Sequence, residues 1–192
     1  KPGREKLILR GSSWVFSGAV EETDGAATAG EPADVFDNDG DWLGRGLWHP
    51  EADMAVRMLT REPFQALDEA FFRTRVREAV ALRHRLYGPP ETWSGTNAFR
   101  MVFSEADGLS GLVADRYADV VLLQVGGKAW LPWLPAVTDE LKASTGAARV
   151  VVRAEGEAVR REGLSEGLGG DAAPDALESR ENGFVFEAGL AG

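Results

Sequence analysis

The segment from Thr96 to Val125 constrains the fold of this chain more than any other. It contains three short apolar runs separated by two tight acidic turns. The last run is continuously apolar, which is typical of a buried central strand. Asp and Gly supply the turn chemistry at Glu105–Gly108, and the second turn spans Tyr117–Asp119. The segment therefore predicts a small sheet, with strands at residues 98–103, 111–113 and 120–125.

The regions on both sides of this segment predict further strands and two helices. Before residue 60 the strands recur about every ten residues with turn-rich connections, which favours a small barrel or sandwich. Apolar residues then follow a helical pattern from Pro63 to Gly88, and a second helix is expected at about 130–144. We expect polar, glycine-rich residues 155–181 to form an extended or partly disordered loop. The expected flanking strands are 6–9, 14–16, 33–36, 42–48, 55–59, 148–153 and 183–188.

Length and composition limit the possible classes of protein. With 192 residues and 44% hydrophobic residues, the chain suits two modest domains. It has no apolar run long enough to span a membrane and no signal-peptide pattern, so we expect no membrane partner and a cytoplasmic location. The sequence has no cysteine and only two histidines, His49 and His84. A disulfide scaffold is excluded, and a metal site is not expected.

The net charge of −10 opposes simple nucleic-acid binding, because carboxylates repel phosphates. The charge is unevenly distributed, however. Residues 1–16 hold four basic residues against one carboxylate, and residues 57–89 hold seven arginines against four carboxylates. The intervening residues 17–56 hold ten carboxylates. A localised basic face on an acidic body is compatible with this distribution.

Two groups of motifs stand out along the chain. The first group is Phe99-Arg100, Glu105-x-Asp107-Gly108-Leu109-x-Gly111-Leu112, Asp115-Arg116-Tyr117 and Asp119. The second group is Arg10-Gly11-Ser12-Ser13-Trp14-Val15-Phe16-Ser17-Gly18-Ala19, Gly30-Glu31, Arg45-Gly46-Leu47-Trp48 and Val56-Arg57-Met58-Leu59. The first group resembles the middle domain, and the second the PUA domain, of the ribosomal large-subunit RNA cytosine-C5 methyltransferases. Members of that family depend on S-adenosylmethionine and begin with a PUA domain. One departure is Ser12-Ser13, where a His-Pro pair commonly precedes the tryptophan.

The resemblance implies an α+β fold in two parts. Residues 1–64 would form a PUA-like β-barrel that binds RNA, and residues 65–192 a linker helix and a strand-strand-helix-strand-strand domain. A Rossmann-like methyltransferase domain would follow, so we expect the chain to be an N-terminal fragment. Cytosine-C5 methylation needs a thiolate nucleophile, which this chain lacks. The fragment is therefore predicted to be inactive, with no catalytic residue and no cofactor of its own, and S-adenosylmethionine is implied for the full-length protein.

The resemblance also implies large-subunit ribosomal RNA as the partner. Arginines would neutralise phosphates, and an exposed aromatic ring would stack on an unpaired base. Trp14 has an equally good alternative as part of the barrel core. The expected contacts are Arg10, Trp14, Phe16 and Arg57, with Arg100 and Arg116 as weaker candidates.

Two other functions are open. The chain could be an assembly module whose hydrophobic sheet and tryptophans meet the missing catalytic domain or a second copy in a homodimer. It could also be a self-contained enzyme using Glu105 and Asp107 as an acid/base pair, although a role in stabilising the turn suits these residues better. Trp130 and Trp133 are expected to pack against the sheet rather than stack on bases.

Three further patterns have ordinary structural explanations. Asp37–Asp41 predicts a hairpin turn, because the sixth and twelfth places of a calcium loop would hold tryptophans. Gly167–Ala172 matches a dinucleotide fingerprint formally, but no strand is expected before it and Pro174 would break the following helix. Arg73 and Arg77 share a helix face, where pairing with nearby carboxylates competes with an RNA-facing ridge.

Overall fold

The computed structural model describes the whole chain except residues 26, 89–91, 93–94, 155 and 190–192. It is an α+β structure, as the sequence predicts. The first part contains α1 (Lys6–Leu9), β1 (Trp14–Phe16), the 3₁₀-helix η1 (Ser17–Ala19), β2 (Pro32–Phe36), β3 (Trp42–Trp48) and β4 (Met54–Thr60). The second contains α2 (Glu69–Tyr87), β5 (Ala98–Phe103), η3 (Ser104–Asp107), β6 (Leu112–Tyr117), β7 (Val120–Val125), η4 (Lys128–Trp133), α3 (Leu134–Thr145), β8 (Arg149–Ala154), α4 (Gly156–Glu162), β9 (Gly167–Gly170), β10 (Leu177–Glu181) and β11 (Phe184–Ala188).

The N-terminal sheet is antiparallel and has the order β1-β4-β3-β2. Its own small core contains Ile8 from α1 together with Val15, Val56 and Met58. Gly46 lets β3 approach β4, because a Cβ at this position would lie 2.1 Å from the carbonyl oxygen of Arg57. Short β1 forms one edge of the sheet, so its outward side chains are accessible.

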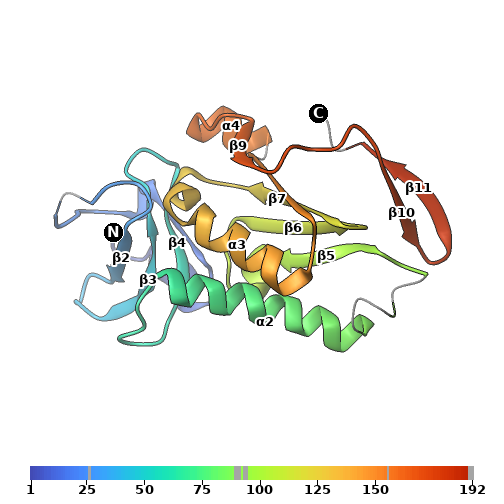
Figure 1. Ribbon diagram of the computed structural model, residues 1–192. Coiled ribbons are helices and arrows are strands. Elements are labelled where there is room, and N and C mark those ends of the chain that lie inside the picture. Colours follow the sequence, from blue (N-terminus) through green and yellow to red (C-terminus); the bar gives the residue numbers. More distant parts are fainter. Residues whose placement is uncertain (26, 89–91, 93–94, 155, 190–192) are drawn as a thin grey trace.

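The second sheet has the order β5-β6-β7-β8-β9. Only β7 and β8 are parallel, and α3 makes the crossover between them. Figure 1 shows α2 and α3 lying together on one face of this sheet. Three strands precede α3 and two follow it, one strand more than the strand-strand-helix-strand-strand order. The three strands before α3 correspond to the three apolar runs that the sequence predicts, and β6 is longer than expected, continuing to Tyr117 through alternating buried and half-buried residues.

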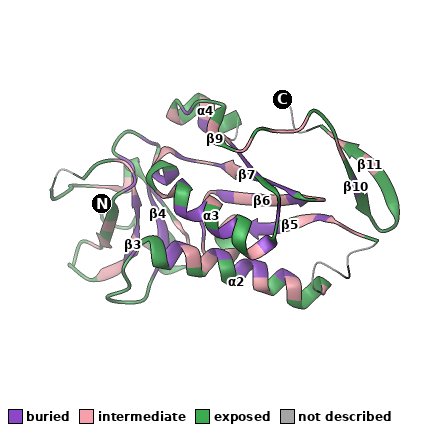
Figure 2. Ribbon diagram, viewed as in Figure 1, coloured by how far each residue is buried: buried purple, intermediate pink, exposed green. Residues whose placement is uncertain are grey.

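One continuous core joins the two sheets. Phe72 and Trp130 are fully buried between the helices and the second sheet, with their ring centres 5.3 Å apart. Leu47 and Leu59 of the N-terminal sheet belong to the same cluster. Figure 2 shows the buried surfaces of α2, α3 and the strands facing one another. The N-terminal sheet therefore packs directly against the second region through a shared core, in addition to being linked to it by the chain.

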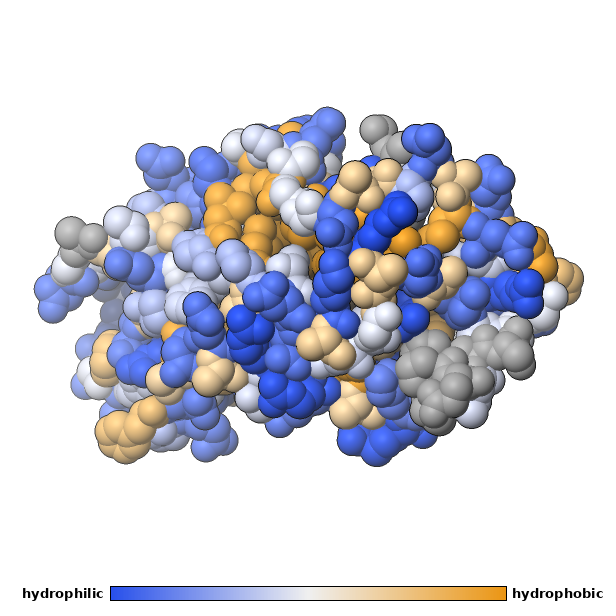
Figure 3. All heavy atoms as spheres, in the orientation of Figure 1, coloured by the Kyte–Doolittle hydropathy of each residue, from blue (hydrophilic) through white to orange (hydrophobic). Residues whose placement is uncertain are grey.

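The C-terminal region ends in the hairpin β10–β11, which lies at the opposite end of the molecule from the N-terminal sheet (Figure 1). The side chains of Phe184 and Val185 on β11 are 78% and 59% exposed. Figure 3 shows a largely hydrophilic face, with apolar side chains gathered between α4 and the start of α3. No helix among the described residues has the length and apolar character needed to cross a membrane.

Two structural expectations are wrong. Residues 6–9 form a helical turn instead of a strand, with Leu9 N bonded to Glu5 O and Arg10 N to Lys6 O. A four-residue apolar run does not distinguish the two conformations. Described residues between 156 and 181 form α4, β9 and β10 instead of a loop. β9 pairs with the free edge of β8, and Asp171 accepts a hydrogen bond from Val150 N. A strand such as β9 pairs with the sheet edge through its backbone, so it needs no apolar pattern that the sequence would show.

Replacing Phe72 with alanine should destabilise the whole structure, because its ring contacts both Phe71 and Trp130 in the shared core. We expect Phe72→Ala to lower the free energy of unfolding by about 3–5 kcal/mol in urea denaturation. Leu86→Ala, an exposed position on the same helix, is the matched control and should change it by less than about 0.5 kcal/mol. Equal losses of unfolding free energy in Phe72→Ala and Leu86→Ala would contradict a central role for Phe72 in the core.

Candidate nucleic-acid interface

A groove of about 290 Å³ lies between α1 and the two edge strands of the N-terminal sheet, β1 and β2. Trp14 and Phe16 line it from β1, and their rings meet edge to face with centres 6.4 Å apart. The two side chains are 42% and 45% exposed, because alternate residues of an edge strand face away from the core. Trp14 is therefore a surface residue and not part of the barrel core. The groove is completed by α1 and by the turn between β2 and β3.

Glu105 of the second region fixes the orientation of Trp14. The indole Nε1 of Trp14 donates to Glu105 Oε1 at 2.7 Å, and Ser110 Oγ donates to the same oxygen at 2.7 Å. Partial burial raises the pKa of Glu105, but hydrogen bonds from Ser104, Ser110 and Trp14 outweigh burial and bring the pKa below its usual value. A charged carboxylate thus holds the tryptophan ring at the boundary between the two sheets.

Basic and acidic side chains surround the groove. Arg10 follows the last residue of α1 and is exposed, as expected for a phosphate contact. Lys1 and Arg4 line the groove directly, and so do Glu5 and Asp37. The charge around the aromatic pair is therefore mixed, and much less negative than the charge of the whole chain.

Arg57 lies in a different environment from the one that the sequence predicts. Only 8% of it is exposed, and its Nη2 donates to Gly126 O and, at 3.3 Å, to Glu162 Oε1. A Cβ at Gly111 or Gly127 would lie 2.9 or 2.8 Å from the guanidinium, so both glycines make room for it. The side chain of Arg57 crosses from β4 into the second region. A phosphate role does not suit this burial.

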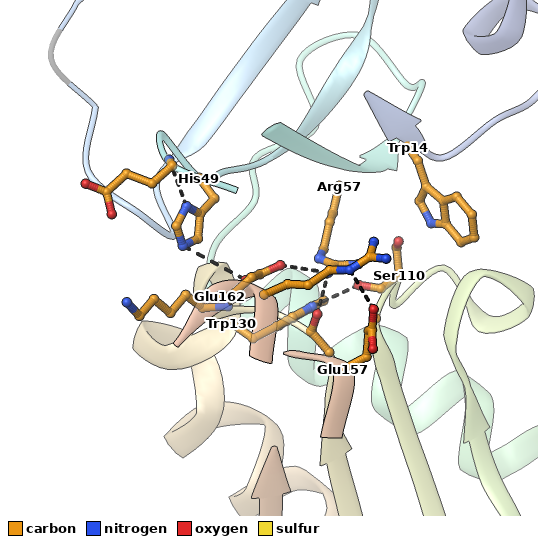
Figure 4. A network of polar contacts seen from close by, with 12 residues as sticks. Trp14, His49, Arg57, Ser110, Trp130, Glu157 and Glu162 are labelled. Atoms are coloured by element: carbon orange, nitrogen blue, oxygen red, sulfur yellow. Dashed lines mark hydrogen bonds and ion pairs between the residues drawn. The ribbon is translucent and has the colours of Figure 1, made fainter. Parts of the chain in front are cut away.

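Glu162 gathers these contacts at the end of α4, as Figure 4 shows. Its Oε2 accepts from the backbone N of Lys128 at 2.6 Å and lies 4.0 Å from His49 Nε2. His49 Nδ1 accepts from Glu51 N, which leaves Nε2 to carry the proton of the neutral ring. Burial lowers the pKa of His49, and nearby Glu162 only partly opposes this shift.

The two weaker arginine candidates also have internal partners. Arg100 forms a two-pronged contact with Asp115, at 2.8 and 3.0 Å, and this hydrogen bonding raises the pKa of Arg100. Arg116 is buried and donates to Thr145 O at the last residue of α3, as well as to Ala118 O. Burial lowers the pKa of Arg116. The structure brings Trp14 and Phe16 together, places Arg10 on the surface at the end of α1, and gives Arg57, Arg100 and Arg116 internal partners.

The carboxylates considered for an acid/base pair or a calcium loop have structural roles in the turns that contain them. Asp107 accepts from Phe103 N and from Arg83 Nη1, both at 2.6 Å, which stabilises the turn after β5. Asp37 Oδ1 accepts from the backbone of Asp39 and Asp41 and closes the hairpin between β2 and β3. Within the described part of the chain, no group of three His, Cys, Asp or Glu residues is arranged to hold a metal ion.

The tryptophans pack as expected, and the helix arginines pair with carboxylates, mainly on α3 instead of on their own helix. Trp130 Nε1 donates to Ser110 O, and Trp133 Nε1 donates to Gly30 O, so both rings serve packing. Arg73 contacts Asp139, and Arg77 contacts Glu140. The two arginines on this face of α2 therefore pair with α3 rather than forming an open ridge.

The glycine-rich stretch does not fit a nucleotide cofactor. Its glycines form β9, an edge strand paired with β8, and no helix follows it directly. A Cβ at Gly170 would lie 2.5 Å from Val150 O, so the glycine permits close strand pairing. A phosphate cradle needs backbone N–H groups at the start of a helix. These residues therefore do not form the phosphate-binding loop of a dinucleotide site.

Sequence reasoning missed Glu162, His49 and the role of Glu105 toward Trp14. Glu162 lies 105 residues from its partner Arg57, so no local spacing links them. The only signal was indirect: glycines at Gly111, Gly126 and Gly127 stand beside strands that otherwise contain large residues. Glycine in such positions often marks the close approach of another group.

The chain is similar to known proteins along its whole length. A family model described as "PUA-like domain" matches residues 1–61, and the N-terminal region is a PUA-like domain. The curated relatives include proteins named "Ribosomal RNA large subunit methyltransferase I". The one from Alteromonas mediterranea is 44% identical over 125 residues, covering 65% of this chain and 30% of the relative. The one from Cronobacter sakazakii is 32% identical over 193 residues, covering 99% of this chain and 48% of the relative.

Solved structures share the fold. A putative SAM-dependent methyltransferase from Streptococcus mutans superimposes with a TM-score of 0.76 at 16% identity, covering 99% of this chain and 47% of that one. A putative methyltransferase solved in complex with SAH gives the same TM-score and identity, covering 97% of this chain and 46% of that one. The chain thus spans less than half the length of the curated relatives and solved structures described here.

Removing the carboxylate of Glu162 should destabilise the junction strongly. Glu162→Ala leaves Arg57 buried without its anionic partner, which we expect to cost about 3–5 kcal/mol in urea unfolding. Glu157→Ala is the matched control on α4, where the carboxylate is exposed and, among the described residues, pairs with Arg160 and Arg161. The control should scarcely change the unfolding midpoint, and a similar shift in both variants would argue against a junction role for Glu162.

His49 should make stability depend on pH. Its pKa is lower in the fold than in the unfolded chain, so the unfolded state binds the proton more tightly. The contribution of neutral His49 is complete above the unfolded pKa of about 6.5 and is lost as pH falls through the folded pKa. Urea midpoints measured from pH 7.5 to 5 should therefore fall less steeply in His49→Gln than in the wild type. If the urea midpoints of the two proteins changed with pH in parallel, His49 would not contribute to the pH dependence of stability.

Proposed function

We propose that this chain is the RNA-recognition portion of an S-adenosylmethionine-dependent methyltransferase that acts on large-subunit ribosomal RNA. The methylated position is C5 of a cytosine. Residues 1–64 are the RNA-binding unit, and residues 65–192 are the linker helix and middle domain that support it. The observation that carries the proposal is the exposed pair Trp14 and Phe16 on the free edge of a PUA-like domain.

Unpaired RNA bases bind proteins by stacking on aromatic rings, and their phosphates pair with basic side chains. Trp14 supplies a large ring held by Glu105, so little conformational entropy is lost when a base stacks on it. Arg10 extends from the adjoining α1 and would meet the backbone of the bound strand. We omit Arg57 and Arg116 from the interface because both guanidinium groups are buried.

Arg100 stays in the proposal as a secondary contact. Its side chain is partly exposed despite the pairing with Asp115. A guanidinium uses the same two-pronged geometry for phosphate as for carboxylate, so exchange between the two is chemically simple. Such a contact would lie on β5, away from the aromatic pair, and would extend the interface onto the second sheet.

The bond-making step belongs, in this proposal, to a catalytic domain outside the present chain. Methylation at cytosine C5 needs a thiolate, and this sequence contains no cysteine. The curated relatives are more than twice as long as the regions that match, which is consistent with a separate catalytic domain. That domain would hold S-adenosylmethionine, and the complete enzyme would act on RNA in the cytoplasm.

A second candidate function, assembly, is favoured by one specific feature. Phe184 and Val185 expose apolar surface on the hairpin β10–β11, where no RNA contact is expected. This hairpin would contact the catalytic domain or a second copy of the chain. The two functions use opposite ends of the molecule and are compatible.

Fluorescence anisotropy with a labelled single-stranded fragment of large-subunit RNA tests the main proposal. Binding should weaken with increasing salt, because phosphate contacts release counterions. Arg10→Glu should weaken binding about tenfold, and Trp14→Ala should remove one stacking contact worth about 1–3 kcal/mol. The charge-matched control is Arg180→Glu on the distant β10, which should stay within about twofold of the wild type.

The outcomes separate the two functions. No detectable binding by a folded wild-type chain would remove RNA recognition and leave assembly as the better explanation. Equal weakening by Arg10→Glu and Arg180→Glu would indicate attraction by total charge and not by the Trp14 face.

A further inference from the structure

A second hollow, of about 260 Å³, lies at the junction of the two sheets. It is distinct from the aromatic groove but adjoins it, because Trp14 lines the groove and its indole donates to Glu105, which lines the hollow. The end of β4, the middle of α2 and the turn after β5 form its walls. Its lining residues are Ser13, Met58, Leu59, Thr60, Arg61, Glu62, Arg75, Glu105, Gly108 and Ser110.

Arg61 is held in this hollow by the main chain. Its Nη2 donates to Ile8 O at 3.0 Å and to Ser12 O at 2.8 Å. Both acceptors are neutral, and no carboxylate of the described residues lies within ion-pair distance of Arg61. Nε and Nη1 of this guanidinium have no hydrogen-bond partner in the described part of the chain. Arg61 therefore presents a fixed positive charge and two nitrogen atoms that can still donate hydrogen bonds.

Arg75 approaches the same hollow from α2. Its Cζ lies 5.1 Å from the centre of the Phe71 ring, and the side chain also borders Gly108. Its carboxylate partner, Glu78, is 3.6 Å away and is 62% exposed. An exposed pair of this kind contributes at most about 1 kcal/mol, so Arg75 can exchange Glu78 for another anion at little cost.

The carboxylates of the hollow do not neutralise these arginines directly. Glu105 directs Oε1 toward Trp14 and Ser110, and these hydrogen-bond donors stabilise its charge. Glu62 is exposed, and its described hydrogen bonds are made by its backbone, with Thr60 Oγ1 and with Gln65 N. The hollow thus combines two available guanidinium groups, and Ser13 also lines it. A doubly coordinating, tetrahedral oxyanion such as a phosphodiester matches this set of donors.

We propose that the junction hollow binds a backbone phosphate of the RNA strand whose base stacks on Trp14. The inference rests on the proposed function and names a second contact for the same RNA. A base and the phosphate of its own or the next nucleotide are joined by a short sugar linkage. The contact of Trp14 with Glu105, which lines the hollow, places the two subsites within reach of one strand. The RNA therefore passes from the PUA-like domain onto α2, and Arg61 and Arg75 are its phosphate contacts.

RNA anisotropy measured as a function of salt tests this proposal. Arg75→Gln should weaken binding about tenfold and should reduce the slope of log affinity against log salt by about one phosphate contact. Arg61→Gln should act in the same direction. Arg85→Gln removes an exposed arginine from the same helix, outside the hollow, and should change neither the affinity nor the slope. Thermal unfolding followed by circular dichroism shows whether each variant is folded, and Arg75→Gln is the decisive variant if Arg61→Gln is unstable.

The result also separates this inference from the proposed function. If the wild type binds RNA and Arg10→Glu weakens binding, but folded Arg75→Gln keeps the wild-type affinity and salt slope, the phosphate subsite is wrong and RNA recognition stands. If Arg75→Gln and Arg85→Gln weaken binding equally, the subsite is also wrong, because the effect is then one of overall charge. If the folded wild type binds no RNA, both proposals fail.

Discussion

The contact of Arg57 with Glu162 determines how the two halves of this molecule are arranged. The guanidinium leaves β4 of the PUA-like domain, passes between Gly111 and Gly127, and meets the carboxylate at the end of α4. Two charges withdrawn from water need each other and well-placed hydrogen bonds. Gly126 O and Lys128 N supply those bonds. This contact tolerates little change in geometry, so it fixes the position of one sheet relative to the other.

Two weaker links act alongside it. Trp14 donates to Glu105, and Trp133 donates to Gly30. Each joins the N-terminal region to the second region, in addition to the shared apolar core. As a result, the aromatic groove and the junction hollow keep a constant spacing. A surface made from two structural units can recognise one strand of RNA only when those units do not move independently.

Much of the fold could be predicted from the sequence because it follows local patterns. The strands β1, β3, β5 and β7 occupy the expected residues, and α2 ends at the expected glycine, Gly88. Helix α1 and the region after residue 155 differ because their conformations depend on tertiary contacts. Ile8 O and Ser12 O are bound by Arg61, and β9 exists only as a partner of β8.

The site was less predictable than the fold. Trp14 and Phe16 stand on a short strand within a motif of the resembling family, and the structure exposes both, while their contact with RNA stays a proposal. The role of each arginine was harder to predict, because the sequence does not show whether its side chain faces solvent or pairs with a buried carboxylate. Arg57 and Arg116 have internal partners, and their burial came from pairings over long chain separations. Arg61 and Arg75, which remain accessible, do not stand out from the other arginines of that region.

The separation between Arg57 and Glu162 has a consequence during protein synthesis. The PUA-like domain leaves the ribosome first, but the carboxylate partner of Arg57 follows 105 residues later. At about 5–20 residues per second, translation leaves this arginine without its partner for roughly 5–20 seconds. During that interval the nascent domain displays an additional cation on the face that will later be covered. Only after α4 has been made is this charge withdrawn, so the newborn and finished forms of the domain present different surfaces to polyanions around the ribosome.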